Sequence, residues 1–304
     1  MRNLLRISAL LAWLALSGVS FAQDVEPRRW THLPVGLNVL GAAYVYTDGD
    51  IFLDPVLLVD NAETEQHTAV VGYTRSFGLA GRTARLDVLL PIRKARWQGL
   101  LDGVFTTVRR EGLADPIFRL SVNLVGGPAL KSKEFREFRA ARTTSTIVGM
   151  GLAVTVPLGE YKKDKLLNLG GNRFVIRPEI GVVHTRGRWS YELTGSVFLF
   201  EDNDEFWNGN KLEQNPLYVV QAHVIHVFRR GKWLALSAAY GRGGESEIND
   251  VRKNDRRDTI LSAVTFGFPI TQTQGLKIAY IRGRRQEDVG ADTDNFAVVW
   301  SKRF

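Results

Sequence analysis

The chain has 304 residues, no cysteine, 44% hydrophobic residues and a formal net charge of +8. The missing cysteines exclude a disulfide scaffold and a thiolate metal site, and a mean hydropathy of −0.11 argues against a bundle of membrane-spanning helices. The basic surplus is compatible with nucleic acid, an anionic membrane surface or an anionic solute as partner.

Residues 1–22 have the pattern of a cleaved signal peptide. Two arginines precede an apolar run over residues 7–19, which is too short to span a membrane as a helix. Ala22 then ends a small-residue cleavage pattern. The alternative is a buried N-terminal helix. We expect an exported mature chain, residues 23–304, that forms one domain, and export removes nucleic acid from the partners.

The mature chain alternates between apolar and mixed positions in stretches of roughly ten residues, with almost no helical periodicity. In one stretch Val148, Met150 and Leu152 alternate with glycines. Because successive side chains on a strand face opposite ways, each stretch predicts a strand with one apolar face and one mixed face. The expected strands are residues 35–46, 67–77, 82–94, 115–125, 143–156, 172–184, 188–200, 217–228, 232–241, 257–269, 275–284 and 294–304.

The connections between these stretches alternate in length. Tight turns with glycine lie at 78–81, 186–187, 230–231 and 271–275, and the long polar connections are 47–66, 95–114, 157–171, 201–216, 242–256 and 285–293. This alternation is typical of bacterial outer-membrane barrels. We predict an all-β, antiparallel up-and-down transmembrane β-barrel of about 12 strands, with 10 or 14 as alternatives. Residues 126–142 predict a short amphipathic helical insertion on the periplasmic side.

The last strand carries an aromatic C-terminal residue. Phe296, Val298, Trp300 and Phe304 share one parity. This arrangement resembles the signal by which outer-membrane barrels are recognised by the barrel-assembly machinery. The competing fold is a secreted soluble β-sandwich, but its outward faces would be polar, whereas here one face of each strand is strongly apolar.

The mixed faces carry charges of both signs, which predicts a wet lumen. The candidate pore-lining residues are Arg85, Asp87, Arg119, Asn123, Arg177, Glu179, Glu192, Gln221, His223 and Lys277. They could select solutes by size and charge, or simply bond to one another across a narrow lumen. A barrel of about twelve strands lies between those that side chains fill and the open porins, so we expect a narrow or partly plugged lumen.

Basic residues gather in the long connections and at the strand ends beside them. If these connections face outward, the cations meet the phosphates of lipopolysaccharide; solvated loops are the alternative. The candidate contacts are Lys162, Lys163, Lys165, Arg252, Lys253, Arg256, Arg257, Arg284 and Arg285.

The sequence supports neither a metal site nor a cofactor, and we expect no enzymatic activity. His223 and His226 are three residues apart, which on a strand puts them on opposite faces, so they cannot chelate one ion. A barrel lipase would need a serine and a histidine in hydrogen-bond reach. No G-x-S-x-G motif is present, and only a pair assembled from distant strands would serve.

An ordered set of short motifs resembles the MetA-pathway phenol-degradation family of proteobacterial outer-membrane proteins. The set runs through Leu33 to Gly36, Asn38, Asp54-Pro55, Tyr73 to Phe77, Pro91, Asp115-Pro116, Asn123-Leu124, Pro128 to Leu130, Glu134-Phe135, Pro157 to Tyr161, Asn168 to Arg173, Asn203, Phe206, Gly209, Tyr240 and Gly243-Gly244. Ala114 departs from the glycine expected before Asp115. The resemblance implies a β-barrel that admits small compounds, often aromatic or hydrophobic, and it carries over no catalytic residue.

We therefore expect a monomeric barrel in the bacterial outer membrane that acts as a channel for passive uptake of small organic compounds, aromatic or hydrophobic ones among them. Its partners would be outer-membrane lipid, lipopolysaccharide and the solute. The alternative is a non-conducting structural barrel that binds lipopolysaccharide through its basic loops, and a barrel lipase is a remote third.

Overall fold

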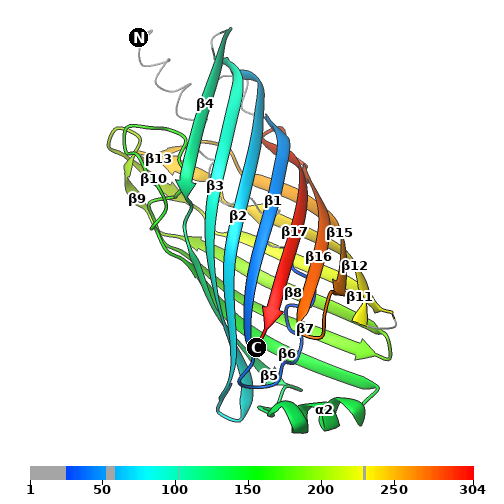
Figure 1. Ribbon diagram of the computed structural model, residues 1–304. Helices are drawn as coiled ribbons and strands as arrows, with labels where there is room; N and C mark the ends of the chain where they lie inside the picture. The colour runs from blue at the N-terminus through cyan, green and yellow to red at the C-terminus, as the bar shows by residue number, and fades with distance from the viewer. Residues whose placement is uncertain (1–24, 53–58, 102, 229–230) are drawn as a thin grey trace.

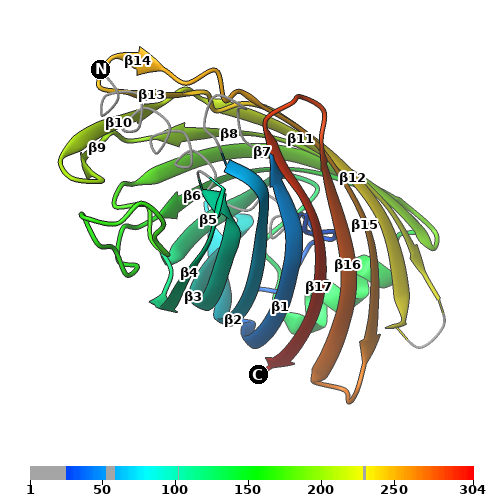
Figure 2. The ribbon, with the colours of Figure 1, turned by 90° about the horizontal axis from the view of Figure 1, so that it is seen from above.

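A computed structural model describes residues 25–52, 59–101, 103–228 and 231–304. The expected signal peptide lies outside these residues. Within them, twelve antiparallel strands close into a barrel in which β17 pairs with β1 (Figure 1, Figure 2). The barrel strands are β1 (Asn38–Phe52), β2 (Val59–Leu79), β3 (Arg82–Leu101), β5 (Ile117–Val125), β6 (Thr144–Thr155), β7 (Val175–Arg186), β8 (Trp189–Phe200), β11 (Leu217–Val227), β12 (Trp233–Gly243), β15 (Arg257–Pro269), β16 (Gln274–Arg285) and β17 (Gly290–Arg303).

The expected fold class and strand number are confirmed, but several strands are longer than expected. β1, β2 and β3 continue into the connections 47–66 and 95–114, and β4 (Val104–Leu113) pairs with β3 as a hairpin that projects past the barrel (Figure 1). Their outward positions change there from apolar residues to charges such as Asp48 and Glu65. The apolar alternation fades where the strands leave the bilayer, although the backbone pairing continues.

Part of the long connections forms a small second sheet. It consists of β9 (Asn203–Phe206), β10 (Asn210–Gln214), β13 (Ser246–Ile248) and β14 (Val251–Arg252). Phe206, Leu212 and Ile248 pack as its apolar core. The connections 201–216 and 242–256, expected to be loops, therefore contain paired strands at the extracellular end of the barrel.

The expected insertion at 126–142 contains a helix, α2 (Ser132–Ala140), at the end of the barrel that carries the tight turns (Figure 1). The side chain of Glu134 accepts a hydrogen bond from the backbone N–H of Lys131 at 3.1 Å, which caps the first turn. The regular helix is shorter than the insertion. We refer to this end as the periplasmic end, because short turns face the periplasm in outer-membrane barrels.

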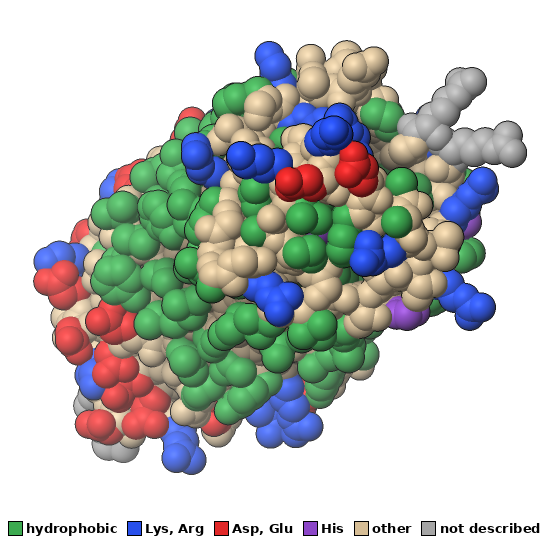
Figure 3. All heavy atoms as spheres, turned by 90° about the horizontal axis from the view of Figure 1, so that it is seen from below, with side chains coloured by type: hydrophobic (Ala, Val, Ile, Leu, Met, Phe, Trp, Pro, Cys, Tyr) green, Lys and Arg blue, Asp and Glu red, His purple; other side chains and the backbone are tan. Residues whose placement is uncertain are grey.

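The outer surface of the barrel is apolar. Leu152 on β6, Ile180 on β7 and Leu236 on β12 point outward and are each about half exposed, and hydrophobic side chains cover the flank of the molecule (Figure 3). In a water-soluble protein such large side chains would be buried, whereas here they form a band that suits lipid. None of the described helices is long and apolar enough to cross a membrane.

The C-terminal residue takes part in closing the barrel. The backbone N–H of Phe304 donates to the carbonyl of Asn38 at 2.9 Å, and the reverse bond measures 3.1 Å. Phe296 and Val298 face outward, and Trp300 donates from its indole to the side chain of Gln274 at 3.0 Å. The role of these residues as an assembly signal stays a prediction.

The outward face of β8 gives a direct test of burial in lipid. We expect Leu193→Arg to lower the free energy of unfolding of the barrel in lipid vesicles by about 2–4 kcal/mol, because a cation would then face hydrocarbon. Leu158→Arg is the matched control, since Leu158 is exposed in the connection between β6 and β7. Denaturant unfolding in vesicles measures both. An equal small effect of the two variants would contradict a lipid-facing position for Leu193.

Candidate functional site

Residues 25–33, which precede β1, lie inside the barrel, and we call them the plug. Val25 packs against Leu261 and Ala263 on β15 and Ile281 on β16. These three wall residues are buried and share the inward parity of their strands. No element is predicted from the sequence in this segment, so the plug is a feature that only the structure reveals.

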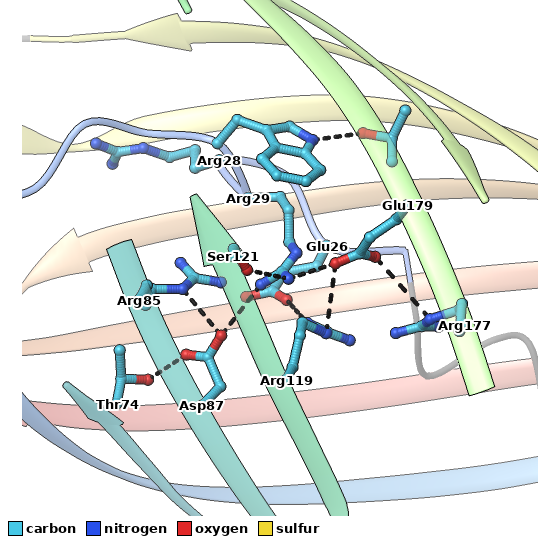
Figure 4. Close-up of polar contacts among 12 residues, drawn as sticks. Glu26, Arg28, Arg29, Thr74, Arg85, Asp87, Arg119, Ser121, Arg177 and Glu179 are labelled. Carbon is cyan, nitrogen blue, oxygen red and sulfur yellow. Dashed lines mark hydrogen bonds and ion pairs between the residues drawn. The ribbon is translucent and has the colours of Figure 1, made fainter. Parts of the chain in front are cut away.

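Arg29 is the charged centre of the plug. Its guanidinium donates hydrogen bonds to Asp87 on β3 at 3.2 Å and to Ser121 on β5 at 2.8 Å. It also forms an ion pair with Glu179 on β7 (Figure 4). The side chain of Arg29 is 5% exposed. One plug residue therefore ties together three strands of the wall.

Asp87 is held from the wall as well as from the plug. Arg85 donates from Nε to one carboxylate oxygen of Asp87 at 2.9 Å, and Thr74 donates to the other at 2.6 Å (Figure 4). A buried carboxylate is tolerated when it is paired and its remaining lone pairs are hydrogen-bonded. The wall therefore holds the Asp87 carboxylate in position to accept the hydrogen bond from Arg29.

Glu179 and Glu26 extend the network to the other side of Arg29. The Nε atoms of Arg119 and Arg177 lie 3.7 Å and 3.9 Å from the carboxylate of Glu179. Arg119 also donates to Glu26 of the plug at 3.2 Å (Figure 4). Plug and wall thus share one network of alternating charges.

Trp30 anchors the plug by shape. Its side chain is 1% exposed and packs with Ile147 and Val183, and its indole N–H donates to Thr194 on β8 at 2.8 Å. Gly149 on β6 and Gly181 on β7, which pair directly, lie against the indole. A Cβ atom at either glycine would overlap the ring, so the two glycines form a slot for it.

The plug leaves the barrel beside α2. His32 is buried, contacts the carbonyl of Pro128 at 2.8 Å, and meets the rings of Phe135 and Phe138 edge-on at 4.9 Å and 5.6 Å. Burial lowers the pKa of the His32 imidazole, and the cation of Arg139 adds to this lowering. The ring is therefore neutral at pH 7, which suits its contact with two aromatic rings.

A cavity of about 580 Å³ lies between the plug and the opposite wall. Its wall comes mostly from β1, β2, β16 and β17 and the turn between β15 and β16, with Arg85 of β3 and Trp233 of β12. Much of it is small or apolar, as at Gly41 and Ala43. Glu26 and Arg28 line it from the plug. The plug is therefore bound to one side of the lumen and leaves space on the other.

The structure places the expected pore-lining residues on inward positions. Arg85, Asp87, Arg119 and Glu179 belong to the network around the plug, and Glu192 accepts a hydrogen bond from the backbone N–H of Arg28 at 2.7 Å. The remaining members, which are buried or partly buried, are Asn123, Arg177, Gln221, His223 and Lys277. Whether solutes pass along them stays a prediction.

The basic residues expected to contact lipopolysaccharide are mostly paired with acids. Six of the nine form ion pairs: Lys162–Glu160, Lys163–Glu205, Lys165–Asp164, Arg252–Glu247, Arg256–Glu287 and Arg284–Asp294. Arg285 stacks on Phe52 at 3.6 Å, and Lys253 is partly buried. Arg257 shares the inward parity of Leu261 on β15. Contact of these nine residues with lipopolysaccharide stays a prediction.

A serine and histidine pair does form, but inside the barrel. His223 Nδ1 lies 2.8 Å from Ser237 Oγ across β11 and β12, and both side chains are buried. His226, on the opposite face, contacts the ring of Trp189 at a tilt and the ring of Phe228 edge-on, with centroid distances of 4.4 Å and 4.7 Å. The pair therefore lies away from the lipid-facing surface.

The structure gives several family motifs a shared role at the extracellular end. The carboxylate of Asp115 accepts backbone hydrogen bonds from Gly159 at 2.8 Å and Gly171 at 2.6 Å. Asn203 donates to the hydroxyl of Tyr161 at 2.9 Å. These residues, which are distant in sequence, fold the connection between β6 and β7 against the barrel mouth.

The plug left only indirect signals in the sequence. One is the run from Glu26 to Trp30, which places charges and a tryptophan before the first strand without any periodicity. The other is the set of inward glycines at 149, 151 and 181, which leave unfilled space in a lumen. Neither signal shows that the tryptophan fits the space left by the glycines, since that depends on how the strands are arranged.

Comparisons with known proteins agree with this architecture. The family described as "Putative MetA-pathway of phenol degradation" matches residues 49–288. The crystal structure of the COG4313 outer membrane channel from Pseudomonas putida F1 is similar, with a TM-score of 0.78 and 21% identity over 92% of this chain and 100% of that chain. The translocator domain of the autotransporter NalP from Neisseria meningitidis is more distant, with a TM-score of 0.51 and 11% identity over 90% and 91%. At these identities the likeness shows the fold alone. No curated protein sequence matches the chain.

The glycine slot predicts how the plug responds to crowding. We expect Gly149→Val to expel Trp30, because the new side chain needs the space of the indole, and thus to expose the plug to added protease and shift tryptophan emission to the red. Gly195→Val is the control, since nothing lies within 4 Å of a Cβ at Gly195. A Gly149→Val barrel with native emission and a protected plug would contradict this packing.

Proposed function

Because the chain belongs to the MetA-pathway phenol-degradation family, we propose that this outer-membrane barrel is a channel for passive passage of small organic compounds, closed in the present state by its plug. The solute would move through the lumen down its concentration gradient. Part of the plug would have to move for a wide path to open, because Arg29 and Trp30 are buried inside the lumen against one side of the wall.

The observation that carries this proposal is the way in which the plug is held. Arg29 contacts Asp87, Ser121 and Glu179 through side-chain bonds alone, and the adjoining cavity of about 580 Å³ is already empty of protein. A barrel with a purely structural role could fill its lumen with apolar side chains from its own strands. A polar lumen with a separable segment suits a gated path better.

The inner position of the His223 and Ser237 pair weighs against a lipase, because a phospholipid in the bilayer meets only the outer face. We therefore keep the expectation of a non-enzymatic barrel as a proposal. Contact with lipopolysaccharide is also proposed, but the pairing of most of its expected cations with acids favours a supporting role over a dedicated binding function.

Replacing Arg29 tests the gate. We expect Arg29→Ala to raise the conductance of the barrel in planar lipid bilayers at least severalfold, because Asp87 and Glu179 lose their shared plug cation. Breaking one partner out of a buried ion-pair network typically costs about 3–5 kcal/mol, which is enough to favour a displaced plug.

Arg186→Ala serves as the matched control, since Arg186 is an exposed arginine at the periplasmic turn, and it should leave conductance unchanged. Folding of each variant is checked by heat-dependent mobility in gels. A folded Arg29→Ala barrel that stays silent, together with a silent barrel lacking the plug, residues 25–33, would support the non-conducting alternative.

A further inference from the structure

We propose that the cavity beside the plug is a binding site for small aromatic monocarboxylates, in which the carboxylate of Glu26 occupies the place of the solute's carboxylate. The inference rests on the proposed channel function and names its class of solute. It predicts that solute and plug compete for the same cations.

The wall of the cavity suits a flat apolar body. Gly41 and Ala43 on β1 pair with Gly72 and Val70 on β2, and all four line the cavity. A Cβ at Gly41 would meet nothing closer than 3.6 Å, so no side chain covers the backbone at this point of the wall. Cavities of several hundred Å³ with mostly apolar walls and a few polar groups are the usual form of small-molecule sites.

The charges around the cavity are strongly one-sided. Among the described residues, its lining contains the cations Arg28, Arg85, Lys277 and Arg303 against the single carboxylate of Glu26. Glu26 is itself paired with Arg119 at 3.2 Å. The surplus of positive charge in a confined space favours entry of anions.

Lys277 and Arg85 are the cations best placed for an incoming carboxylate. Lys277 forms no hydrogen bond or ion pair with the described residues, although its charge acts on Glu26. Arg85 uses Nε for Asp87, which leaves its two Nη groups for another acceptor. Guanidinium and ammonium groups bind carboxylates through short, charge-assisted hydrogen bonds.

Glu26 shows what such an acceptor looks like. Its side chain is 41% exposed and lines the cavity, and its carboxylate experiences the charges of Lys277, Arg85, Arg119 and Arg29. A solute carboxylate entering the cavity meets these same cations. Its ring would lie on the wall of β1 and β2, and the indole of Trp233 on β12 also lines the space.

Calorimetric titration of the folded mature chain in detergent tests the site, with benzoate as the probe. Benzyl alcohol, which has the ring without the charge, and acetate, which has the charge without the ring, should both bind at least roughly tenfold more weakly. Lys277→Gln should weaken benzoate about tenfold, equivalent to about 1.4 kcal/mol. Gly41→Leu should abolish binding by filling the cavity without changing any charge.

Glu26→Gln tests whether benzoate competes with the Glu26 carboxylate for the same cations. It keeps the side-chain length and removes the competing charge, so benzoate should bind more tightly while benzyl alcohol is unchanged. Lys94→Gln, which removes an exposed cation on the outer face of β3, should change nothing. Equal binding of benzoate and benzyl alcohol, or weaker benzoate binding by Glu26→Gln, would overturn the assignment.

The two proposals fail in different ways. A chain that binds benzoate as described but never conducts, even without its plug, loses the channel function and keeps the site. A chain that conducts, with no benzoate binding and no preference for anions in its reversal potential, keeps the channel and loses the site.

Discussion

The guanidinium of Arg29, buried between Asp87 and Glu179, is the contact around which the interior of this barrel is organised. Alternation along the strands forces charged side chains inward, where water is scarce, and each of them then needs a partner. Asp87 and Glu179 lie on different strands, and each already has arginines of the wall beside it. Arg29 links the two carboxylates to each other through one side chain, so the plug is fixed to both strands inside the lumen.

The size of the barrel explains why such a segment is needed. Strand number sets the diameter, and twelve strands enclose more space than their own side chains fill, yet less than an open porin. Glycines at 149 and 181 deepen that space on one side, where Trp30 enters, and Gly41 and Gly72 do so on the other, where no plug residue reaches. The plug therefore lies off-centre, and the cavity is what it leaves uncovered. The proposed solute site and Glu26 of the plug therefore face the same two cations, Lys277 and Arg85.

The strands themselves could be predicted because their cause is local. Lipid outside and polar groups inside impose a period of two on every strand, and that period is visible in residues such as Val148, Met150 and Leu152. The hairpin of β3 and β4 could not be predicted in this way. It extends beyond the bilayer into water, where a strand needs no apolar face and the alternation is therefore absent. The contacts of the plug and the hydrogen bonds of Asp115 could not be predicted either. Their partners, Glu179 and Gly171, are distant in sequence and have no periodic relation to them.

By itself the sequence determined that the chain forms a barrel of about twelve strands, which faces of its strands are apolar, and that charges of both signs line the inside. It did so because the bilayer acts on each strand separately and residue by residue. Only the tertiary structure decided which of these charges meet, that Arg29 and Trp30 occupy one side of the lumen, and that Lys277 and Arg85 face open space. Those outcomes depend on closure of the sheet, which places β3, β5 and β7 around the same plug residue. No local sequence pattern encodes that contact.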